Sequence, residues 1–431
     1  MMAFGKQDLI KGGEVIVDEC RLVSQNGAGL DLTNHFSNIN IYEDIYSNTL
    51  TGTIELVDGL NIAQHLPLMG QEVLHLTFFT PGLKKNKVKF MVNEVGTRVS
   101  DKAQKMQTYT LHLISEEHMA NTNKRVSKAY EGEIDTIVEE VLREYLTEEK
   151  SFFTEPTAFT HKFVIPNWTP LRTINWLASH AVSKDNMEVS NYMFFETIDG
   201  FYLAPLSKLM QQSVKQEYRF DPSGTLQTES GKRDIFRELK NIERYTVKPS
   251  AIRDAQMAGG MFSGRLITHD LVTKKVEEKD FSYSDHFQNT PSVEKNAPVS
   301  TTMSLANSQE SSFVRFAPKH NYKYDDIENN DRSESFVLER NSLIRQIKQG
   351  QGMSIIVPGD SRRRVGDIVD VKIPSAEPKQ TMEQWYDVSA SGKYMITQIR
   401  HAISNKDYKL FLDLSRDSAM QAFPDVKTSM I

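Results

Sequence analysis

Short runs of alternating apolar and polar residues fill the first part of the chain. The runs TGTIELVDG, QEVLHLTFF, KFMVNEV and YTLHL, which lie between Thr51 and Leu113, each repeat with a period of two. Residues such as Gly, Pro and Asn separate them, as they separate the strands of a β-sheet. The pattern predicts a β-rich domain from the N-terminus to about residue 118.

The periodicity becomes helical in the next part of the chain. Six apolar residues of EIDTIVEEVLREYL fall on one helical stripe. A second helix is expected in NWTPLRTINWLASHA, where Thr169 can cap the N-terminus and Pro170 can occupy the first helical position. The two apolar runs of NYMFFETIDGFYLAPL meet at Asp199 and Gly200, which predicts a hairpin. Residues 119–206 should therefore form a small α+β domain.

A polar region interrupts the strand patterns of the second half. Residues 207–250 contain the strand-like pieces EYRF and ERYTV, whereas residues 251–335 are mostly polar. Within the polar region, GRLITHDLVTKKVEEKDFSY has the alternation of a β-hairpin, and the Ser, Thr, Asn and Pro-rich stretch 288–312 is typical of an irregular connection. SESFVLERNSLIRQIKQG predicts a helix that ends at Gly350. Its expected inner positions are Phe336, Leu338, Leu343 and Ile347.

Strands near the C-terminus match the strand runs near the N-terminus in the same order. Four matches in one order exceed what alternation alone supplies, so the sequence predicts an internal duplication. Each copy would be a small, strongly curved sheet or barrel that a long hairpin closes. Three such chains, related by rotation in a closed ring, would present six similar barrels. The matched segments are Thr53–Gly59 with Met353–Gly359, Met69–Leu76 with Val365–Lys372, Lys89–Val92 with Lys393–Ile396, and Tyr109–Leu113 with Tyr408–Leu412.

Length, charge and cysteine content limit the class of protein to which this chain can belong. The chain has 431 residues, too many for one compact domain, and 39% of them are hydrophobic, enough for folded cores. The formal net charge of −6 argues against a general nucleic-acid binder, because such proteins carry a basic excess. The single cysteine, Cys20, excludes an intrachain disulfide and favours a reducing compartment. Neither a signal peptide nor a membrane-spanning run is expected.

Few residues suggest catalysis, metal binding or cofactor binding. His112 and His118 lie six positions apart rather than four, so they would not share a helical face as metal ligands do. TESGKRD lacks the preceding glycine of a phosphate loop, and no GxSxG motif marks a nucleophile. Cys20 is expected to be a buried structural thiol. We therefore expect no catalytic residue, no cofactor and no metal.

The densest basic cluster is SRRRVGD, Ser361–Asp367. It can be a solvated turn or a contact with an acidic partner such as an adjoining subunit. Together with the hairpins of the two copies, it supplies seven candidate interface residues: Arg362, Arg363, Arg364, Lys393, Tyr394, Lys89 and Phe90.

With these segments in this order, the chain resembles the baseplate hub proteins of contractile-tailed bacteriophages, and it is similar to the hub part of type VI secretion and pyocin spikes. The resemblance is carried by NWTPLRTINWLASHA with NYMFFETIDGFYLAPL, by GRLITHDLVTKKVEEKDFSY, and by VGDIVDVKIP with SGKYMITQIRHAISNKDYKLFLDLSRDS. It implies a homotrimer whose two tube-type barrels per subunit make a pseudo-six-fold ring. Such a ring joins the hexameric tail tube to the trimeric central spike and lines the DNA ejection channel.

The patterns and the resemblance together predict a β-rich α+β fold with a definite domain plan. The plan is a first tube-type barrel (1–118), a small α+β domain (119–206), a second, discontinuous barrel (207–250 with 336–420), a polar insertion (251–335) and a C-terminal tail (421–431).

The resemblance also implies partners and a location. The partners are the spike, the tail tube or its initiator, baseplate wedge proteins and a tape measure protein in the lumen, with DNA only in transit. The OB-like domain and β-helix of fused spikes do not follow the last strand, so the spike is expected as a separate chain. The expected location is the tail baseplate of the virion, after assembly in the host cytoplasm.

Two other classes of function stay open at this point. A tail-associated cell-wall hydrolase would need convergent titratable groups in a cleft, and peptidoglycan hydrolysis that one carboxylate substitution abolishes would favour it. A ligand-binding barrel protein would bind an oligonucleotide or glycan as a monomer. For the hub hypothesis, the net charge predicts a neutral to acidic lumen that does not retain DNA.

Overall fold

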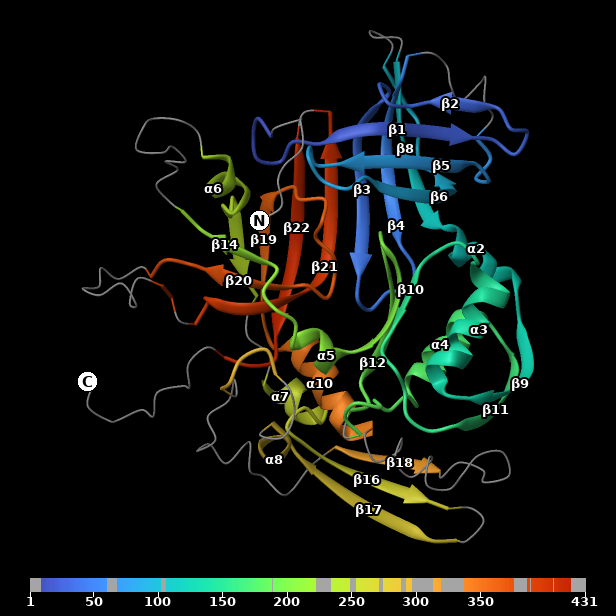
Figure 1. The fold of residues 1–431 in the computed structure, drawn as a ribbon, viewed down its shortest axis with the longest axis vertical. Coiled ribbons are helices and arrows are strands. Elements are labelled where there is room, and N and C mark those ends of the chain that lie inside the picture. The colour runs from blue at the N-terminus through green and yellow to red at the C-terminus, as the bar shows by residue number, and fades with distance from the viewer. Residues whose placement is uncertain are drawn as a thin grey trace.

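The computed structural model describes residues 9–59, 68–101, 106–187, 189–221, 234–248, 253–270, 274–287, 292–296, 313–318, 337–375, 386–387, 389–405 and 407–419. Within these ranges the chain is β-rich, as predicted, and one large sheet forms its centre (Figure 1). The sheet has 14 strands and is antiparallel except where β14 (Gln216–Arg219) pairs with β20 (Ile368–Lys372).

The first half of the sheet comes from the N-terminal residues. Its strands pair in the order β3-β4-β8-β6-β5-β1-β2, with β7 beside β8. Alternate residues are buried, as in β4, where Ile54 and Leu56 are inside and Thr53 and Glu55 are partly exposed. The period-two prediction is therefore confirmed. The bounds are β1 (Ile16–Val23), β2 (Gly29–Asp31), β3 (Phe36–Asp44), β4 (Thr51–Asp58), β5 (Val73–Phe79), β6 (Asn86–Val95), β7 (Val99–Asp101) and β8 (Met106–Ser115).

The second half of the sheet comes mostly from the C-terminal residues. Its strands pair in the order β15-β19-β22-β21, and β20 and β14 continue from β21. The additional strands are β15 (Arg244–Val247), β19 (Gln351–Pro358), β21 (Gly392–Ser404) and β22 (Tyr408–Arg416), and two short helices, α5 (Leu206–Met210) and α6 (Ile235–Leu239), flank β14 in sequence.

The two halves form one sheet because β21 pairs with β3. The first residues of β21 pair with β20, and its later residues leave β20 and pair with β3, so that Gln398 lies opposite Asp44 and Ala402 opposite Asn40. Figure 1 shows blue β3 beside red β21, with β22 on the other side of β21. A single hydrophobic cluster spans both halves, so the halves share one core.

A helical part packs against the first half and has its own core. Its hydrophobic cluster contains Ile134, Ile137, Val138 and Val141 of the predicted helix, which are all buried. The predicted helices and hairpin are confirmed. The elements are α2 (Glu116–Asn123), β9 (Val126–Gly132), α3 (Ile134–Val141), the π-helical turn η1 (Leu142–Leu146), β10 (Phe152–Thr154), β11 (His161–Trp168), α4 (Pro170–Ala178), β12 (Tyr192–Thr197) and β13 (Gly200–Pro205).

A smaller part lies at the opposite end from β1, below the sheet in Figure 1. The predicted hairpin is confirmed as β16 and β17, and β18 adds a parallel strand that the sequence analysis did not predict. The predicted helix is confirmed as α10, which links two cores because Leu338 packs in the small cluster and Ile347 in the main one. The bounds are α7 (Arg253–Ala258), β16 (Ser263–His269), β17 (Val276–Ser282), α8 (Tyr283–Phe287), β18 (Val314–Pro318) and α10 (Val337–Gln349).

Thr169 is the N-cap residue of α4 and Pro170 is its first residue, as predicted, but the Thr169 side chain makes no capping hydrogen bond. The Leu171 N–H instead donates to Asn121 Oδ1 at 2.8 Å, so a residue of α2 supplies the acceptor. Phe336, most of the irregular connection 288–312 and the tail 421–431 lie outside the described residues.

Candidate functional site on the open face of the sheet

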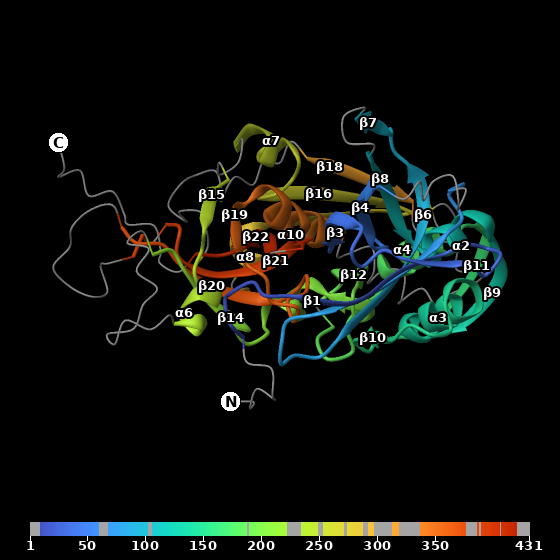
Figure 2. The same cartoon turned by 90° about the horizontal axis from the view of Figure 1, so that it is seen from above.

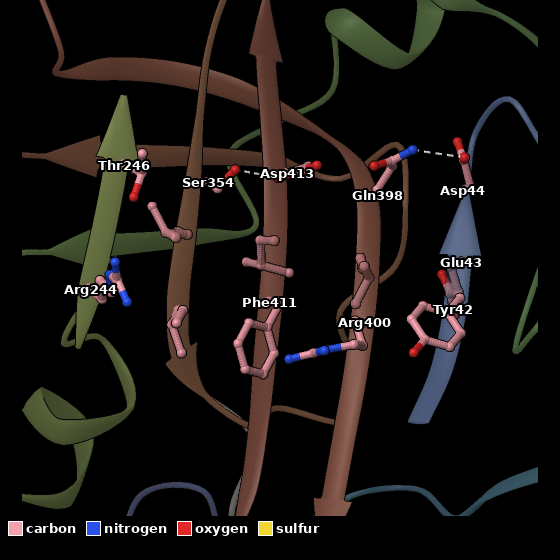
Figure 3. Close-up of a pocket in the computed structure, with 14 residues that line it drawn as sticks. Tyr42, Glu43, Asp44, Arg244, Thr246, Ser354, Gln398, Arg400, Phe411 and Asp413 are labelled. Carbon is pink, nitrogen blue, oxygen red and sulfur yellow. Dashed lines mark hydrogen bonds between the residues drawn. The ribbon is translucent and has the colours of Figure 1, made fainter. Parts of the chain in front are cut away.

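One face of the large sheet is hollowed where β15, β19, β22, β21 and β3 lie side by side (Figure 3). The hollow has a volume of about 460 Å³. Because successive side chains of a strand point to opposite faces, neighbouring residues that border the hollow differ in environment. Ile355, Ile399 and Leu412 border the hollow and are also part of the main core.

An arginine and an aromatic ring meet at the centre of the hollow. The Arg400 guanidinium lies 3.6 Å from the centre of the Phe411 ring, in the geometry of a cation–π contact. Within the described ranges the Arg400 Nε–H has no hydrogen-bond partner. A stacked cation whose buried Nε–H is not hydrogen-bonded therefore lies at the centre of the hollow. Arg400 belongs to a row of direct cross-strand neighbours: Arg244, Ile356, Phe411, Arg400 and Tyr42.

A second row of polar side chains runs beside the first. Ser354 Oγ donates to Asp413 at 2.5 Å, and Gln398 Nε2 donates to Asp44 at 2.8 Å (Figure 3). The Lys248 ammonium lies 3.1 Å from the Asp413 carboxylate. Together with the arginines of the first row, these residues give the hollow both signs of charge.

The basic cluster Ser361–Asp367 lies at an internal junction. The buried Arg364 side chain donates to Asp199 Oδ2 of the helical part at 2.7 Å and to Asn86 Oδ1 of β6 at 3.0 Å. Burial alone would lower the pKa of Arg364, but the carboxylates of Glu43 and Asp199 outweigh it and raise that pKa. Arg364 therefore connects both halves of the sheet with the helical part.

Glu43 completes this junction from β3. Its fully buried carboxylate accepts the backbone N–H groups of Ile198 and Val365, each at 3.1 Å. His401 Nε2 lies 3.6 Å away, and His401 Nδ1 lies 2.8 Å from the Tyr408 hydroxyl. One buried acid of β3 thus binds the backbone of two segments that are distant in sequence and lies beside a side chain of β21.

The other two arginines of the cluster differ in exposure. Arg363 is buried and lies 3.5 Å from the carboxylates of Asp360 and Asp367. The Arg362 side chain is 50% exposed and contacts Asp360 at 2.8 Å. The sequence analysis did not foresee how many acids would surround these arginines.

The remaining candidate interface residues lie on β6 and β21. Phe90 and Tyr394 are core residues, and the Tyr394 hydroxyl donates to the Ala390 carbonyl at 2.8 Å. Lys89 is partly exposed and contacts Glu116 at 2.9 Å. Lys393 is also partly exposed. The role of these residues toward another chain stays a prediction.

A second buried ionic cluster joins the first half of the sheet to the helical part. Lys150 Nζ lies 2.5 Å from the carboxylates of Glu117 and Glu196, and 3.0 Å from Ser115 Oγ. Burial raises the pKa of Glu196, although Lys150 opposes that shift. Burial alone would lower the pKa of Lys150, but the two carboxylates raise it. The cluster holds β8, α2 and β12 together.

His112 and His118, which the sequence analysis considered as metal ligands, occupy different elements. His112 is exposed on β8, and His118 of α2 lies 3.3 Å from Thr49 Oγ1. No group of three His, Cys, Asp or Glu side chains in the described ranges could hold a metal ion. Likewise, no described helix is long and apolar enough to cross a membrane.

The sequence analysis did not single out Arg244, Arg400 or Phe411. Alternation in IRHAIS and KLFLDL identifies two faces for each strand. It does not reveal that these faces line up across five strands, because that depends on pairings between distant segments.

Comparison with known proteins finds a curated relative and solved structures that share this fold. No protein-family model matches the chain. The chain is 20% identical over 416 residues to "Probable baseplate hub protein gp334" of Vibrio phage KVP40, covering 91% of this chain and 93% of the relative.

Two solved structures share the fold at 10% sequence identity. One is the tail protein from Neisseria meningitidis MC58, with a TM-score of 0.57 over 93% of this chain and 96% of that chain. The other is the 43 kDa tail protein of prophage MuSo2 from Shewanella oneidensis, with a TM-score of 0.54 over 94% of this chain and 99% of that chain. The resemblance of this chain to the baseplate hub proteins of phage tails is therefore confirmed over nearly its whole length.

Proposed function

We propose that this chain is the structural hub subunit of a contractile tail, and that three copies close into a pseudo-six-fold ring. The observation that carries the proposal is that two sets of four strands share one pairing order. The first set is β4-β8-β6-β5 and the second is β19-β22-β21-β20, and every pair in both sets is antiparallel. Duplication of an ancestral unit accounts for this agreement.

A matching irregularity supports the duplication. The β6–β8 ladder slips by one residue after Val92, and the β21–β22 ladder slips by one residue after Ile396. A β-bulge at the same place in two ladders is a specific feature, because each bulge re-aims the strand that carries it. The N–H groups of Val92 and Ile396 also donate to equivalent carbonyls, those of Glu72 and Asp367, each at 2.9 Å.

The ladders also correct the sequence alignment of the two copies. Lys89–Val92 still matches Lys393–Ile396. The first pair after each slip is Glu94 with His112 and Gln398 with Asp413, which makes His112 equivalent to Asp413. Tyr109 then matches Leu410 instead of Tyr408, two residues from the expected position. Alternation alone leaves this two-residue shift undetermined, because such a slip keeps every side chain on its own face. Two other expected matches are wrong by one residue: Thr53 matches Ser354 instead of Met353, and Val73 matches Ile368 instead of Val369.

The domain plan remains the one expected from the sequence. We propose barrels at 1–118 and at 207–250 with 336–420, the α+β domain at 119–206 and the insertion at 251–335. The separate hydrophobic cluster of the helical part supports the α+β domain, and the small cluster around β16 supports the insertion. The continuous core of the large sheet suggests that the two barrels form one rigid body.

In this proposal the ring continues the hexameric tail tube on one side and rests on the trimeric spike on the other. Baseplate wedge proteins would surround it, a tape measure protein would enter its lumen, and DNA would pass through without being bound. The mixed charge of the open sheet face supports an inert channel lining. Arg362, Lys89 and Lys393 have exposed or partly exposed side chains and are the candidates that remain for contacts with other chains.

We infer a structural role without catalysis, in the tail baseplate, after assembly in the host cytoplasm. The relatives named above are tail and baseplate proteins, which supports this role.

The test is the mass of the purified protein in solution by light scattering, alone and with the candidate spike chain. We expect a trimer, or a monomer that becomes a three-to-three complex with the spike. A monomer under both conditions would contradict the ring.

A further inference from the structure

Two strand edges in separate parts of the large sheet lack a partner among the described strands. One is the outer edge of β15, which pairs only with β19 there. The other is the edge formed by the end of β6 and by β7, which pair with β8 on their inner side. Figure 2 shows the two edges well apart, with β15 toward the left of the view and β7 at its top. Unpaired edges present free N–H and C=O groups that can pair with another chain.

The contact between the two halves of the sheet shows how such edges can meet. In that contact β3 pairs with the later residues of β21, beyond the bulge after Ile396. If the halves are copies, β15 corresponds to β3, and the end of β6 with β7 corresponds to the later part of β21. The contact inside one subunit can then be repeated between subunits.

The registers identify which residue of β15 corresponds to Asn40 of β3. Asn40 lies opposite Thr53, and Thr53 lies opposite His112. In the second half, Thr246 lies opposite Ser354, and Ser354 lies opposite Asp413. Because His112 and Asp413 are equivalent, Thr246 corresponds to Asn40.

The same reasoning applies to the other edge. Asn40 lies opposite Ala402, and Ala402 lies opposite Lys409, four residues before Asp413. Four residues before His112 is Thr108, whose partner is Val99 of β7. Val99 therefore corresponds to Ala402.

We propose that β15 of one subunit pairs antiparallel with the end of β6 and with β7 of the next copy of this chain, so that Thr246 lies opposite Val99. The inference rests on the proposed duplication. It adds to the proposed ring the two strand edges that meet between subunits, their antiparallel direction and their register. Because the contact joins two different surfaces, it is heterologous and closes into a ring only if the rotation between copies allows it.

Exposure and hydrogen-bond direction favour this contact. The side chains of Val99 and Val247, one on each edge, are 65% and 51% exposed. The Lys248 N–H donates to the Gly352 carbonyl at 2.9 Å, so the N–H of its neighbour Val247 points away from β19. In the contact within the subunit, the Ile45 N–H donates to the Thr397 carbonyl at 3.0 Å. Opposite pairs in an antiparallel ladder alternate between hydrogen-bonded and non-hydrogen-bonded. The Asn40–Ala402 pair lies five positions from the hydrogen-bonded Ile45–Thr397 pair, so it is non-hydrogen-bonded.

This geometry permits a test by disulfide formation. Directly opposite residues in a non-hydrogen-bonded pair have Cα atoms about 4.5 Å apart, within the range that a disulfide bridges. The variant carries Val99→Cys and Thr246→Cys. Its matched control carries Val99→Cys and Arg244→Cys, which moves one cysteine by two residues on the same face to a diagonal position about 7–8 Å away. The natural Cys20 is buried in both.

Under mild oxidation we expect the first variant to form covalent dimers and trimers on a non-reducing gel, while the control and the single variants stay monomeric. Failure of the first variant to cross-link, or equal cross-linking in the control, would overturn the proposed register. A wild-type trimer by light scattering together with that failure would leave the hub ring standing and reject only this edge contact. Cross-linked products longer than three chains would support the strand pairing and reject the closed three-fold ring.

A second variant removes one backbone donor from the edge. Val247→Pro deletes the outward N–H, and proline is tolerated on an edge strand whose N–H faces solvent. We expect it to convert a trimer to monomers without changing the unfolding midpoint of the subunit, whereas Val247→Ala should remain trimeric. A trimer of unchanged stability for Val247→Pro would count against the contact.

Discussion

Replacing Arg364 by methionine should destabilise the folded chain strongly. The substitution removes hydrogen bonds to Asp199 Oδ2 at 2.7 Å and to Asn86 Oδ1 at 3.0 Å, and it takes the nearest cation away from the buried Glu43. Removing one partner of a buried ion pair costs about 3–5 kcal/mol, because the remaining charge stays in a poorly solvating interior. Methionine keeps much of the side-chain volume, so the loss reports the charge and its hydrogen bonds.

The assay is urea-induced unfolding at neutral pH, followed by circular dichroism. Arg362→Met is the matched control, since Arg362 belongs to the same cluster but its side chain is 50% exposed. We expect this control to lose less than about 1 kcal/mol.

Adding Glu43→Gln to Arg364→Met should recover part of the lost stability, because it removes the uncompensated charge. Hydrogen exchange should report the loss at the β3–β21 contact. A cost below about 1 kcal/mol for Arg364→Met, or a cost equal to that of Arg362→Met, would refute the role of Arg364 at the junction.

Three further results are expected. Lys150→Met should cost about 3–5 kcal/mol in urea unfolding because it leaves the buried Glu117 and Glu196 without their cation; a loss comparable to that of an exposed lysine would contradict this. Burial raises the pKa of Asp417 from 3.8 to about 6. The folded state therefore holds this proton more tightly than the unfolded state, and the stability from Asp417 is lost as pH rises from about 4 to 6. Asp417→Asn should remove about 3 kcal/mol of that pH dependence, measured as unfolding midpoints between pH 4 and 7; an unchanged profile would argue against it. Burial raises the pKa of the Cys20 thiol to about 12, so a thiol reagent should label Cys20 only after unfolding; rapid labelling of the native protein would show that β1 opens readily.

Much of the local structure could be predicted from the sequence. The helix at Ile134–Val141, the helix that begins at Pro170 and the hairpin around Gly200 follow from patterns within about 15 residues, and the structure contains all three. These elements depend on local periodicity and on backbone preferences of single residues, which the sequence states directly.

The candidate site was harder to predict because its chemistry depends on distant partners. The segment SRRRVGD looks like a basic surface turn, yet Arg363 and Arg364 are buried. Arg363 pairs with the neighbouring Asp360 and Asp367, but the acids beside Arg364, Glu43 and Asp199, lie far away in sequence. Buried charge of one sign requires charge of the other sign nearby, but the sequence does not say which acid will supply it.

The sequence by itself determined the type of the main elements, the face of each strand that is apolar, and the presence of two similar strand sets. Tertiary structure decided that β21 leaves β20 to join β3, and that Arg244, Phe411 and Arg400 share one open row. The physical reason is that alternation specifies which side of a strand is buried but is unchanged by a slip of two residues. Register and partner are selected only when bulges, buried charges and core side chains from distant segments pack together.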